Sequence, residues 1–247
     1  MRRPLFPLAA FAAAIFLAAG AAHAQTLDDI IALNLKSKGG IDKIKATTSV
    51  RMTGQIAATD PSGQQRKGTM TMLAKRPNLM RREAIVGGQK MINAFDGNSL
   101  WMAVGGMPPQ EAPGPQAAYA KQDAEFDSVF VDYKEKGHKI ELVGKEKVGG
   151  ADAYRLRVTK KGGPPQDYYL DAATGLEKKI SISLDAAQRG AAMTIVTELS
   201  DYREVEGRMV PFSIRQLVNG TPTAATTIDN IEFNVPLDDS AFKMPPK

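Results

Sequence analysis

Cysteine is absent from the 247-residue sequence, so neither a disulfide nor a thiolate centre can form. Histidine is almost as rare, because the sequence has two and His23 lies in an apolar N-terminal stretch. The other, His138, stands between glycine and lysine, a context typical of a solvated loop. A single histidine without cysteine partners makes a poor set of metal ligands. We therefore expect the protein to bind no metal and no cofactor.

The motifs of common enzymes are missing as well. The sequence contains neither G-x-S-x-G nor H-E-x-x-H, and its glycines fall at predicted turns instead of in a phosphate-binding loop before a helix. Carboxylate pairs such as Asp123 and Asp127 remain, and a predicted helix gives them a solvated face. A glycosidase pair stays open, although Trp101 is the only tryptophan available to line a sugar cleft. We expect a protein that is not an enzyme, with an exported hydrolase as the weakest alternative.

The positive charge of the chain is modest and dispersed. Lysine and arginine number 32 against 27 acidic residues, a formal net charge of +5. These basic residues are scattered and have few aromatic neighbours, whereas nucleic-acid binding needs a clustered basic surface. We expect no nucleic-acid partner.

The N-terminus has the composition of an export signal. Arg2 and Arg3 precede an apolar stretch over residues 5–22, and Ala22-His23-Ala24 is a small-x-small cleavage site. We predict a signal peptide over residues 1–24, cleaved after Ala24, a single domain over residues 25–247, and a periplasmic location. An uncleaved membrane anchor is the alternative, which the alanine-rich composition and the A-x-A ending disfavour. No second apolar run is long enough to span a bilayer.

The rest of the chain is dominated by short runs typical of strands. Between Gly68 and Val104, runs of 5 to 8 residues are separated by turn sequences such as Arg76-Pro77-Asn78 and Asp96-Gly97-Asn98. Similar runs continue from Lys139 to Asn234. We predict a mainly β (α+β) fold with about eleven antiparallel strands in a sandwich or barrel-like sheet.

Two longer segments have helical patterns. Thr26 can cap a helix that starts at Leu27 and stops at Gly39-Gly40. Residues 116–133 place Tyr119, Phe126, Phe130 and Tyr133 at helical spacing on one face. We predict that this second helix covers an apolar face of the sheet. The proline-rich and glycine-rich residues 105–115 before it are expected to form no regular element.

Methionine is the unusual constituent of the strands. Met70 and Met72 share one face of a predicted strand, while Thr71 and Leu73 lie on the other. For any single methionine, an ordinary core is the simpler interpretation, but the set suits an adaptable pocket. Alternation alone does not say which face points inward, because a shift of one residue exchanges the two faces.

Several of these motifs resemble a known family. Lys75-Arg76-Pro77-Asn78-Leu79, followed by the residues from Phe95 to Trp101, is similar to the periplasmic outer-membrane lipoprotein carriers of the LolA type. The second half resembles the wider lipoprotein-sorting group at residues 168–175, 207–212 and 234–245. The resemblance in order and character extends over most of residues 25–247.

The resemblance implies a single curved antiparallel sheet, an unclosed half-barrel, with an N-terminal helix and a lid helix over a hydrophobic cavity. It implies that Arg76 holds the lid closed by hydrogen bonds to backbone and is needed for release of cargo, where a solvated turn arginine is the alternative. Met80 matches an apolar cavity position. The implied partners are acyl chains of lipoproteins or another lipid, an inner-membrane donor and an outer-membrane acceptor, and we expect a monomer.

The preferred hypothesis is a periplasmic carrier that delivers such cargo toward the outer membrane. A lipid-sensing regulatory module of an envelope-stress pathway is the alternative, which a dedicated signalling partner would favour. The residues predicted to line the cavity are Met52, Met70, Met72, Met80, Met91, Leu100, Met102, Phe126 and Phe130.

Overall fold

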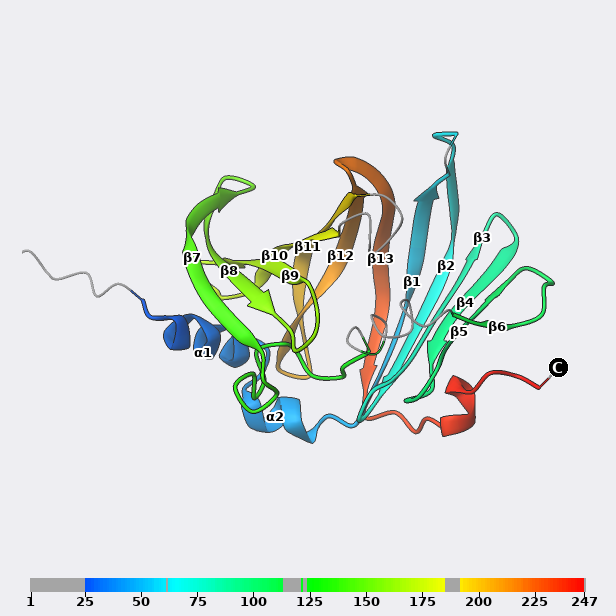
Figure 1. The fold of residues 1–247 in the computed structure, drawn as a ribbon, viewed down its shortest axis with the longest axis horizontal. Coiled ribbons are helices and arrows are strands. Elements are labelled where there is room, and N and C mark those ends of the chain that lie inside the picture. The colour runs from blue at the N-terminus through cyan, green and yellow to red at the C-terminus, as the bar shows by residue number, and fades with distance from the viewer. Residues whose placement is uncertain (1–24, 61, 113–120, 122–123, 185–191, 247) are drawn as a thin grey trace, which may run out of the picture.

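The computed structural model describes residues 25–60, 62–112, 121, 124–184 and 192–246. The predicted signal peptide, residues 1–24, lies outside these ranges. The described residues form two α-helices, one short 3-10 helix and thirteen strands that belong to one sheet (Figure 1).

The helices are α1 (Leu27–Ser37), α2 (Ile41–Ala46) and the 3-10 helix η1 (Asp239–Phe242). The strands are β1 (Ser49–Thr59), β2 (Gln65–Lys75), β3 (Leu79–Val86), β4 (Gln89–Phe95), β5 (Leu100–Val104), β6 (Gln110–Glu111), β7 (Lys139–Val148), β8 (Ala151–Thr159), β9 (Pro165–Asp171), β10 (Glu177–Leu184), β11 (Met193–Val205), β12 (Arg208–Val218) and β13 (Thr221–Phe233).

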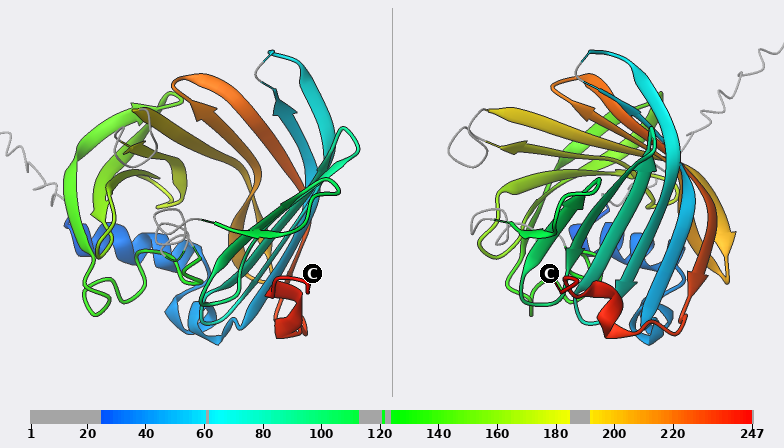
Figure 2. Two further views of the ribbon diagram at one scale, coloured as in Figure 1. Left: turned by 45° about the vertical axis from the view of Figure 1, so that its right-hand side comes forward. Right: turned by 90° about the vertical axis from the view of Figure 1, so that its right-hand side faces the viewer.

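The strands follow the order β6-β5-β4-β3-β2-β1-β13-β12-β11-β10-β9-β8-β7, and every neighbouring pair is antiparallel. Consecutive strands other than β6 and β7 pair with each other, and the pairing of β1 with β13 joins the two halves of the sheet. The sheet is strongly curved, and its edge strands β6 and β7 lie at opposite ends and do not pair with each other (Figures 1 and 2). The predicted unclosed antiparallel half-barrel is therefore confirmed.

The strand count was predicted too low, at about eleven. One of the thirteen strands, β6, lies inside the segment expected to have no regular structure. Trp101 pairs with Glu111, and Met102 with Gln110. Prolines at 108, 109 and 113 confine this pairing to two residues, because proline lacks the amide hydrogen that a longer strand needs.

Helix α1 begins as predicted. Thr26 Oγ1 accepts a hydrogen bond from the Asp29 amide at 3.2 Å, and the Asp29 carboxylate accepts one from the Thr26 amide at 3.0 Å, which makes a capping box. The helix buries Ile30 and Ile31 against strands at the β7 end of the sheet, in a cluster that includes Leu156. Helix α1 therefore fills the concave face at this end.

The prediction of a lid helix over residues 116–133 is wrong for residues 124–133, which form turns and bends. Residues 113–120 and 122–123 lie outside the described ranges, and Lys121 between them is helical. Val129, Phe130 and Val131 are successive and all buried. A surface helix turns successive residues about 100° apart and cannot bury all three on one stripe. The burial of all three neighbours therefore favours turns over the helix that the spacing of the aromatic residues predicts.

The two faces of the sheet separate as the alternation predicts. Met52 lies opposite Met72 in the register of β1 and β2, and both face the concave side. The convex face near β3 is covered by the C-terminal segment, where Trp101 Nε1 donates to the Phe242 carbonyl at 2.7 Å. Figure 2 shows η1 lying on the outer surface of this part of the sheet.

Helices α1 and α2 run for 11 and 6 residues. Among the described residues, no helix combines the length and apolar character needed to cross a bilayer.

Candidate functional site

A cavity of about 360 Å³ lies on the concave face where β1, β2 and β10 to β13 meet α2. This volume falls at the lower end of the range of about 300–1,000 Å³ that is usual for small-molecule sites. Its wall is mostly apolar, and the apolar residues are Ile44, Val50, Met52, Met72, Ala74, Phe126, Ile180, Leu199, Met209, Val210, Pro211 and Phe233.

Three of the nine predicted cavity residues line this wall: Met52, Met72 and Phe126. The two methionines are cross-strand neighbours, so their flexible thioether side chains form one continuous surface. Phe126 approaches from the segment that follows β6, across the concave side. The wall thus brings together residues more than fifty positions apart in the sequence.

Four predicted residues lie on the same concave face, nearer the β6 edge. Met80 and Leu100 are buried with Phe95 beneath Ala112 and Ala124, and Met102 packs against this cluster. Met91 is half-buried in β4, where it pairs with Ala84 and Val104. These residues face the concave side but lie outside the wall of the cavity.

The remaining two predicted residues pack into core clusters. Met70 lies against the cluster of Phe212 and Ile228. Phe130 is 1% exposed and meets the Tyr168 ring edge-on at 5.4 Å between centroids. Phe130 belongs to the core beneath α1, because its segment turns there instead of continuing as a helix.

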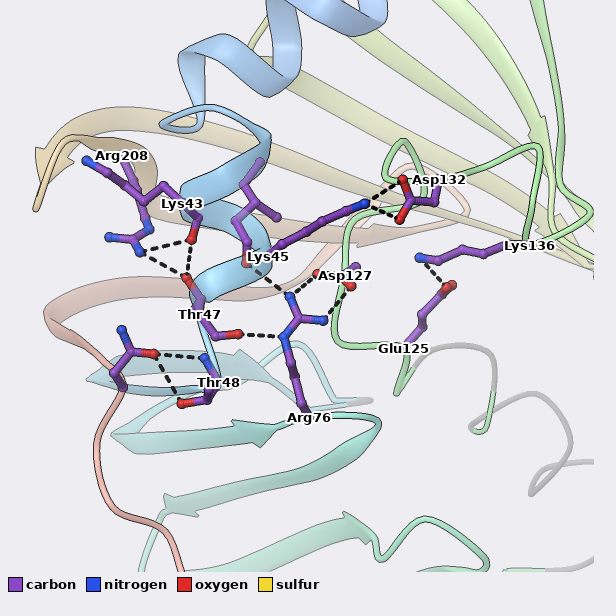
Figure 3. A network of polar contacts seen from close by, with 12 residues as sticks. Lys43, Lys45, Thr47, Thr48, Arg76, Glu125, Asp127, Asp132, Lys136 and Arg208 are labelled. Carbon is purple, nitrogen blue, oxygen red and sulfur yellow. Dashed lines mark hydrogen bonds and ion pairs between the residues drawn. The ribbon is translucent and has the colours of Figure 1, made fainter.

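Arg76 lies at the junction between α2, the β2–β3 turn and residues 124–137 (Figure 3). Its guanidinium donates to the two Asp127 carboxylate oxygens, at 2.6 Å each. It also donates to the backbone carbonyls of Thr47, at 2.6 Å, and Ile44, at 3.0 Å. The Arg76 guanidinium carbon lies 4.7 Å from the centre of the Phe126 ring. One side chain thus joins the end of α2 to the segment that carries part of the cavity wall.

A further ion pair ties the same segment to α2, because Lys45 lies 2.7 Å from Asp132. These two side chains are 51% and 43% exposed, and exposed pairs of this kind contribute little. Lys136 lies 2.6 Å from Glu125, and both of these residues belong to the segment. The Arg76–Asp127 pair is better protected, because the Asp127 side chain is 15% exposed. Arg76 is therefore the principal polar tie between the segment and α2.

Arg208 binds the same end of α2 from the opposite wall of the cavity (Figure 3). Its Nη2 donates to Thr47 Oγ1 at 2.9 Å and to the Lys43 carbonyl at 3.3 Å. Its guanidinium carbon lies 4.3 Å from the centre of the Phe233 ring. No sequence signal singles out Arg208 as a site residue, although it lies in residues 207–212, which resemble the lipoprotein-sorting group.

A second polar group in the wall consists of Lys38, Glu177 and Tyr202. Lys38 forms an ion pair with the Glu177 carboxylate, and the Tyr202 hydroxyl donates to the Glu177 carbonyl at 2.7 Å. Burial raises the pKa of Tyr202 far above its ordinary value, so the hydroxyl stays protonated and keeps this bond. No local sequence pattern points to this group, because its members come from three separate parts of the chain.

His138 is not the solvated residue that its sequence context predicts. Its side chain is 8% exposed, Nδ1 accepts a hydrogen bond from the Lys161 amide at 3.2 Å, and Nε2 lies 3.4 Å from Glu125. The backbone contact draws the ring inward from the loop. Across the described ranges, no three histidine, aspartate or glutamate side chains lie close enough together to hold a metal ion.

Several solved structures share the fold of this chain but resemble it only weakly in sequence. A DUF1329 family protein from Desulfovibrio piger has a TM-score of 0.58 at 15% identity, over 87% of this chain and 96% of its own. A LolA superfamily protein from Nitrosomonas europaea, NE2245, has a TM-score of 0.56 at 13% identity, over 89% and 98%.

A putative outer membrane lipoprotein-sorting protein domain from Vibrio parahaemolyticus has a TM-score of 0.52 at 14% identity, over 81% of this chain and 93% of its own. Neither a protein-family model nor a curated protein matches the chain. The shared architecture, an open antiparallel half-barrel, is the LolA-like fold.

Proposed function

We propose that the protein is a carrier that binds acyl chains of lipoproteins or of another lipid and delivers them toward the outer membrane. The observation that carries this proposal is the cavity itself. It is an apolar hollow on the concave face of a LolA-like half-barrel, with one side formed by a segment held through Arg76.

The apolar wall can supply affinity without directional contacts. Each methylene group transferred from water into the cavity contributes about 0.8 kcal/mol. Met52 and Met72 can adapt to chains that differ in shape, because methionine side chains are unbranched and flexible. A carrier benefits from such tolerance, since the same site must accept and release cargo.

Release requires a change that opens or shrinks the cavity, and Arg76 is the proposed latch. Its bonds to Thr47 and Ile44 hold α2, while its bonds to Asp127 hold the facing segment. Breaking this junction would free both sides together. The buried cluster of Met80, Leu100 and Met102 would then extend the surface available to longer cargo.

The Vibrio parahaemolyticus structure is named as a lipoprotein-sorting domain, which supports this function for the shared fold. On the proposed function, residues 1–24 direct export to the periplasm and are removed there. An inner-membrane donor would load the carrier, and an outer-membrane acceptor would receive the cargo. The carrier would act as a monomer.

The test is to purify the protein from its own periplasm and to examine it by native mass spectrometry. We expect a bound lipid or a covalently acylated cargo. Titration of delipidated protein with the uncharged fluorophore N-phenyl-1-naphthylamine should give saturable binding. If the protein carries no lipid and binds no fluorophore saturably, the proposed function is refuted.

A further inference from the structure

Among the described residues, one positive charge in the cavity wall has no close carboxylate partner. The wall contains four ionised side chains, Lys38, Asp127, Glu177 and Arg208. Lys38 and Glu177 neutralise each other, and Asp127 is neutralised by Arg76. The charge of Arg208 is what remains.

The contacts of Arg208 are mostly with neutral oxygens. Nη2 donates to Thr47 Oγ1 and to the Lys43 carbonyl, and Nη1 lies 3.4 Å from the Glu206 carbonyl. The closest recorded carboxylate is that of Glu206, 3.7 Å from Nη1, on a side chain that is 59% exposed. Such a distant and solvated pair is weak. The Arg208 side chain itself is only 9% exposed.

Arg208 also has hydrogen-bonding capacity left over. Its Nε is buried and finds no hydrogen-bond partner among the described residues. A buried donor without an acceptor is costly, and more so on a charged group. A guanidinium presents its donors in a fixed fork that suits carboxylate and phosphate oxygens. The wall therefore combines a long apolar surface with one buried, partly unpaired cation.

The cavity volume limits how much apolar ligand can accompany this cation. A group of water size occupies about 30 Å³ of liquid volume, and a methylene group is of similar size. The cavity of about 360 Å³ therefore holds roughly a dozen such groups. That is enough for one acyl chain of about twelve carbons.

We infer that the preferred ligand of this cavity is a single-chain amphiphile with an anionic carboxylate or phosphate head, which binds at Arg208. The chain lies along Met52, Met72 and Phe126, and the head replaces the weak interaction with Glu206. This inference rests on the proposed function, because it requires that the cavity binds acyl chains, and it adds which kind of head is recognised.

The test measures displacement of N-phenyl-1-naphthylamine by three ligands with the same twelve-carbon chain: laurate, dodecyl phosphate and dodecanol. The fluorophore is uncharged, so its binding does not depend on Arg208. For the unaltered protein we expect at least one anion to bind at least about tenfold more tightly than dodecanol, the scale of a hydrogen bond to a charged group. A preference for laurate alone would indicate a free fatty acid, and a preference for dodecyl phosphate alone a monoacyl phosphate.

Arg208→Met should reduce this preference to below about threefold while dodecanol binding is kept. Arg215→Met is the matched control, because Arg215 lies on the same strand, is 54% exposed and pairs with Glu198. Thr47→Val removes the bond that ties Arg208 to α2 but leaves the charge, and should keep the preference. Arg208→Lys, which also keeps the charge, serves if Arg208→Met does not fold, and should keep a preference for the anion.

The possible outcomes distinguish failure of the head-group assignment from failure of the proposed carrier function. Saturable fluorophore binding with equal affinity for dodecanol and both anions would overturn the head-group assignment and leave the carrier function standing. A preference for anions that survives in folded Arg208→Met would also overturn the role of Arg208. Absence of binding by the fluorophore and by dodecanol would overturn the proposed function, and the head-group inference with it.

Discussion

Two regions of the same concave face differ in packing: one is filled by core side chains and the other leaves a cavity. At the β7 end, Ile30 of α1 and Phe130 pack on Leu156 and Leu170, and each of these side chains is at most 1% exposed. In the middle of the sheet, β1, β2 and β10 to β13 also present an apolar face but leave a cavity. The strands are alike, so the difference lies in what covers them.

The covers differ in length and in apolar surface. Helix α1 has 11 residues and an apolar stripe that buries Ile30 and Ile31. Helix α2 has 6 residues and buries none of them completely, and it is fixed mainly by arginine contacts to its C-terminal carbonyls. A long apolar helix turns the β7 end of the face into core, whereas a short helix held by polar contacts leaves a cavity in the middle. Whether a region of the sheet becomes core or binding site thus depends more on the helix that covers it than on the strands.

Truncation of one side chain in each region is the strongest way to break this comparison. We expect Phe130→Ala to lower the free energy of unfolding by about 3–5 kcal/mol, because it opens a void in a packed core. Met72→Ala should cost no more than about half as much, since its side chain already borders a cavity. Urea unfolding followed by circular dichroism measures both. Equal losses would mean that the two regions are packed alike.

The next effect concerns the junction at Arg76. We expect Arg76→Leu to fold, with a loss of about 2 kcal/mol, because Asp127 is left partly buried without its cation. Fluorophore binding should persist, while amide hydrogen exchange over residues 124–137 rises and delivery of cargo fails. Arg51→Leu is the control, as Arg51 is 41% exposed and its ion pair lies away from the cavity wall. Unchanged exchange in Arg76→Leu would remove the latch from the proposal.

A larger side chain in the cavity wall should fill the cavity and make the middle of the concave face resemble the packed β7 end. Ala74 lies in the wall beside Val50 and Met80 in the strand register. We expect Ala74→Phe to weaken fluorophore binding more than about tenfold, while stability changes by about 1 kcal/mol or less because the new ring enters existing space. Titration and urea unfolding test the two parts. Large destabilisation with intact binding would show that position 74 does not border the ligand.

Much of this sheet is predictable from local sequence. The alternation of Met70 and Met72 with Thr71 and Leu73 assigns residues to faces, and turn residues such as Asp96-Gly97-Asn98 mark the hairpins. Both signals depend on neighbours in the chain. The signals fail where burial depends on distant residues. Aromatic spacing predicts a helix through Phe130, and contact with α1 and β8 produces buried turns instead.

The polar part of the site shows the same limit. The contact between Arg208 and Thr47 joins residues 161 positions apart, and no local pattern predicts it. The role predicted for Arg76 comes from the resemblance of its turn to a motif of a known family. Such a motif carries information about distant contacts, and composition does not. Met80 and Phe130 have the right character for a cavity, yet their position depends on which segment covers each stretch of the sheet.

The smallest expected effect is a pH dependence on the convex side of the packed region. Burial raises the pKa of Asp167, but hydrogen bonds from Arg157 and Arg155 outweigh it, so the pKa lies below its ordinary value. A carboxyl whose pKa falls on folding stabilises the protein above its unfolded pKa, near 3.9, and this contribution disappears as pH falls through the lower folded pKa. Asp167→Asn removes the contribution at neutral pH.

We therefore expect Asp167→Asn to be less stable than the unaltered protein at pH 7 and to lose less stability between pH 4 and pH 2. Urea unfolding at a series of pH values measures the two slopes. Asp229→Asn is the matched control, because Asp229 accepts a hydrogen bond from the neutral side chain of Gln55. Parallel pH profiles for Asp167→Asn and the unaltered protein would mean that the arginine pair does not stabilise the packed region through this carboxylate.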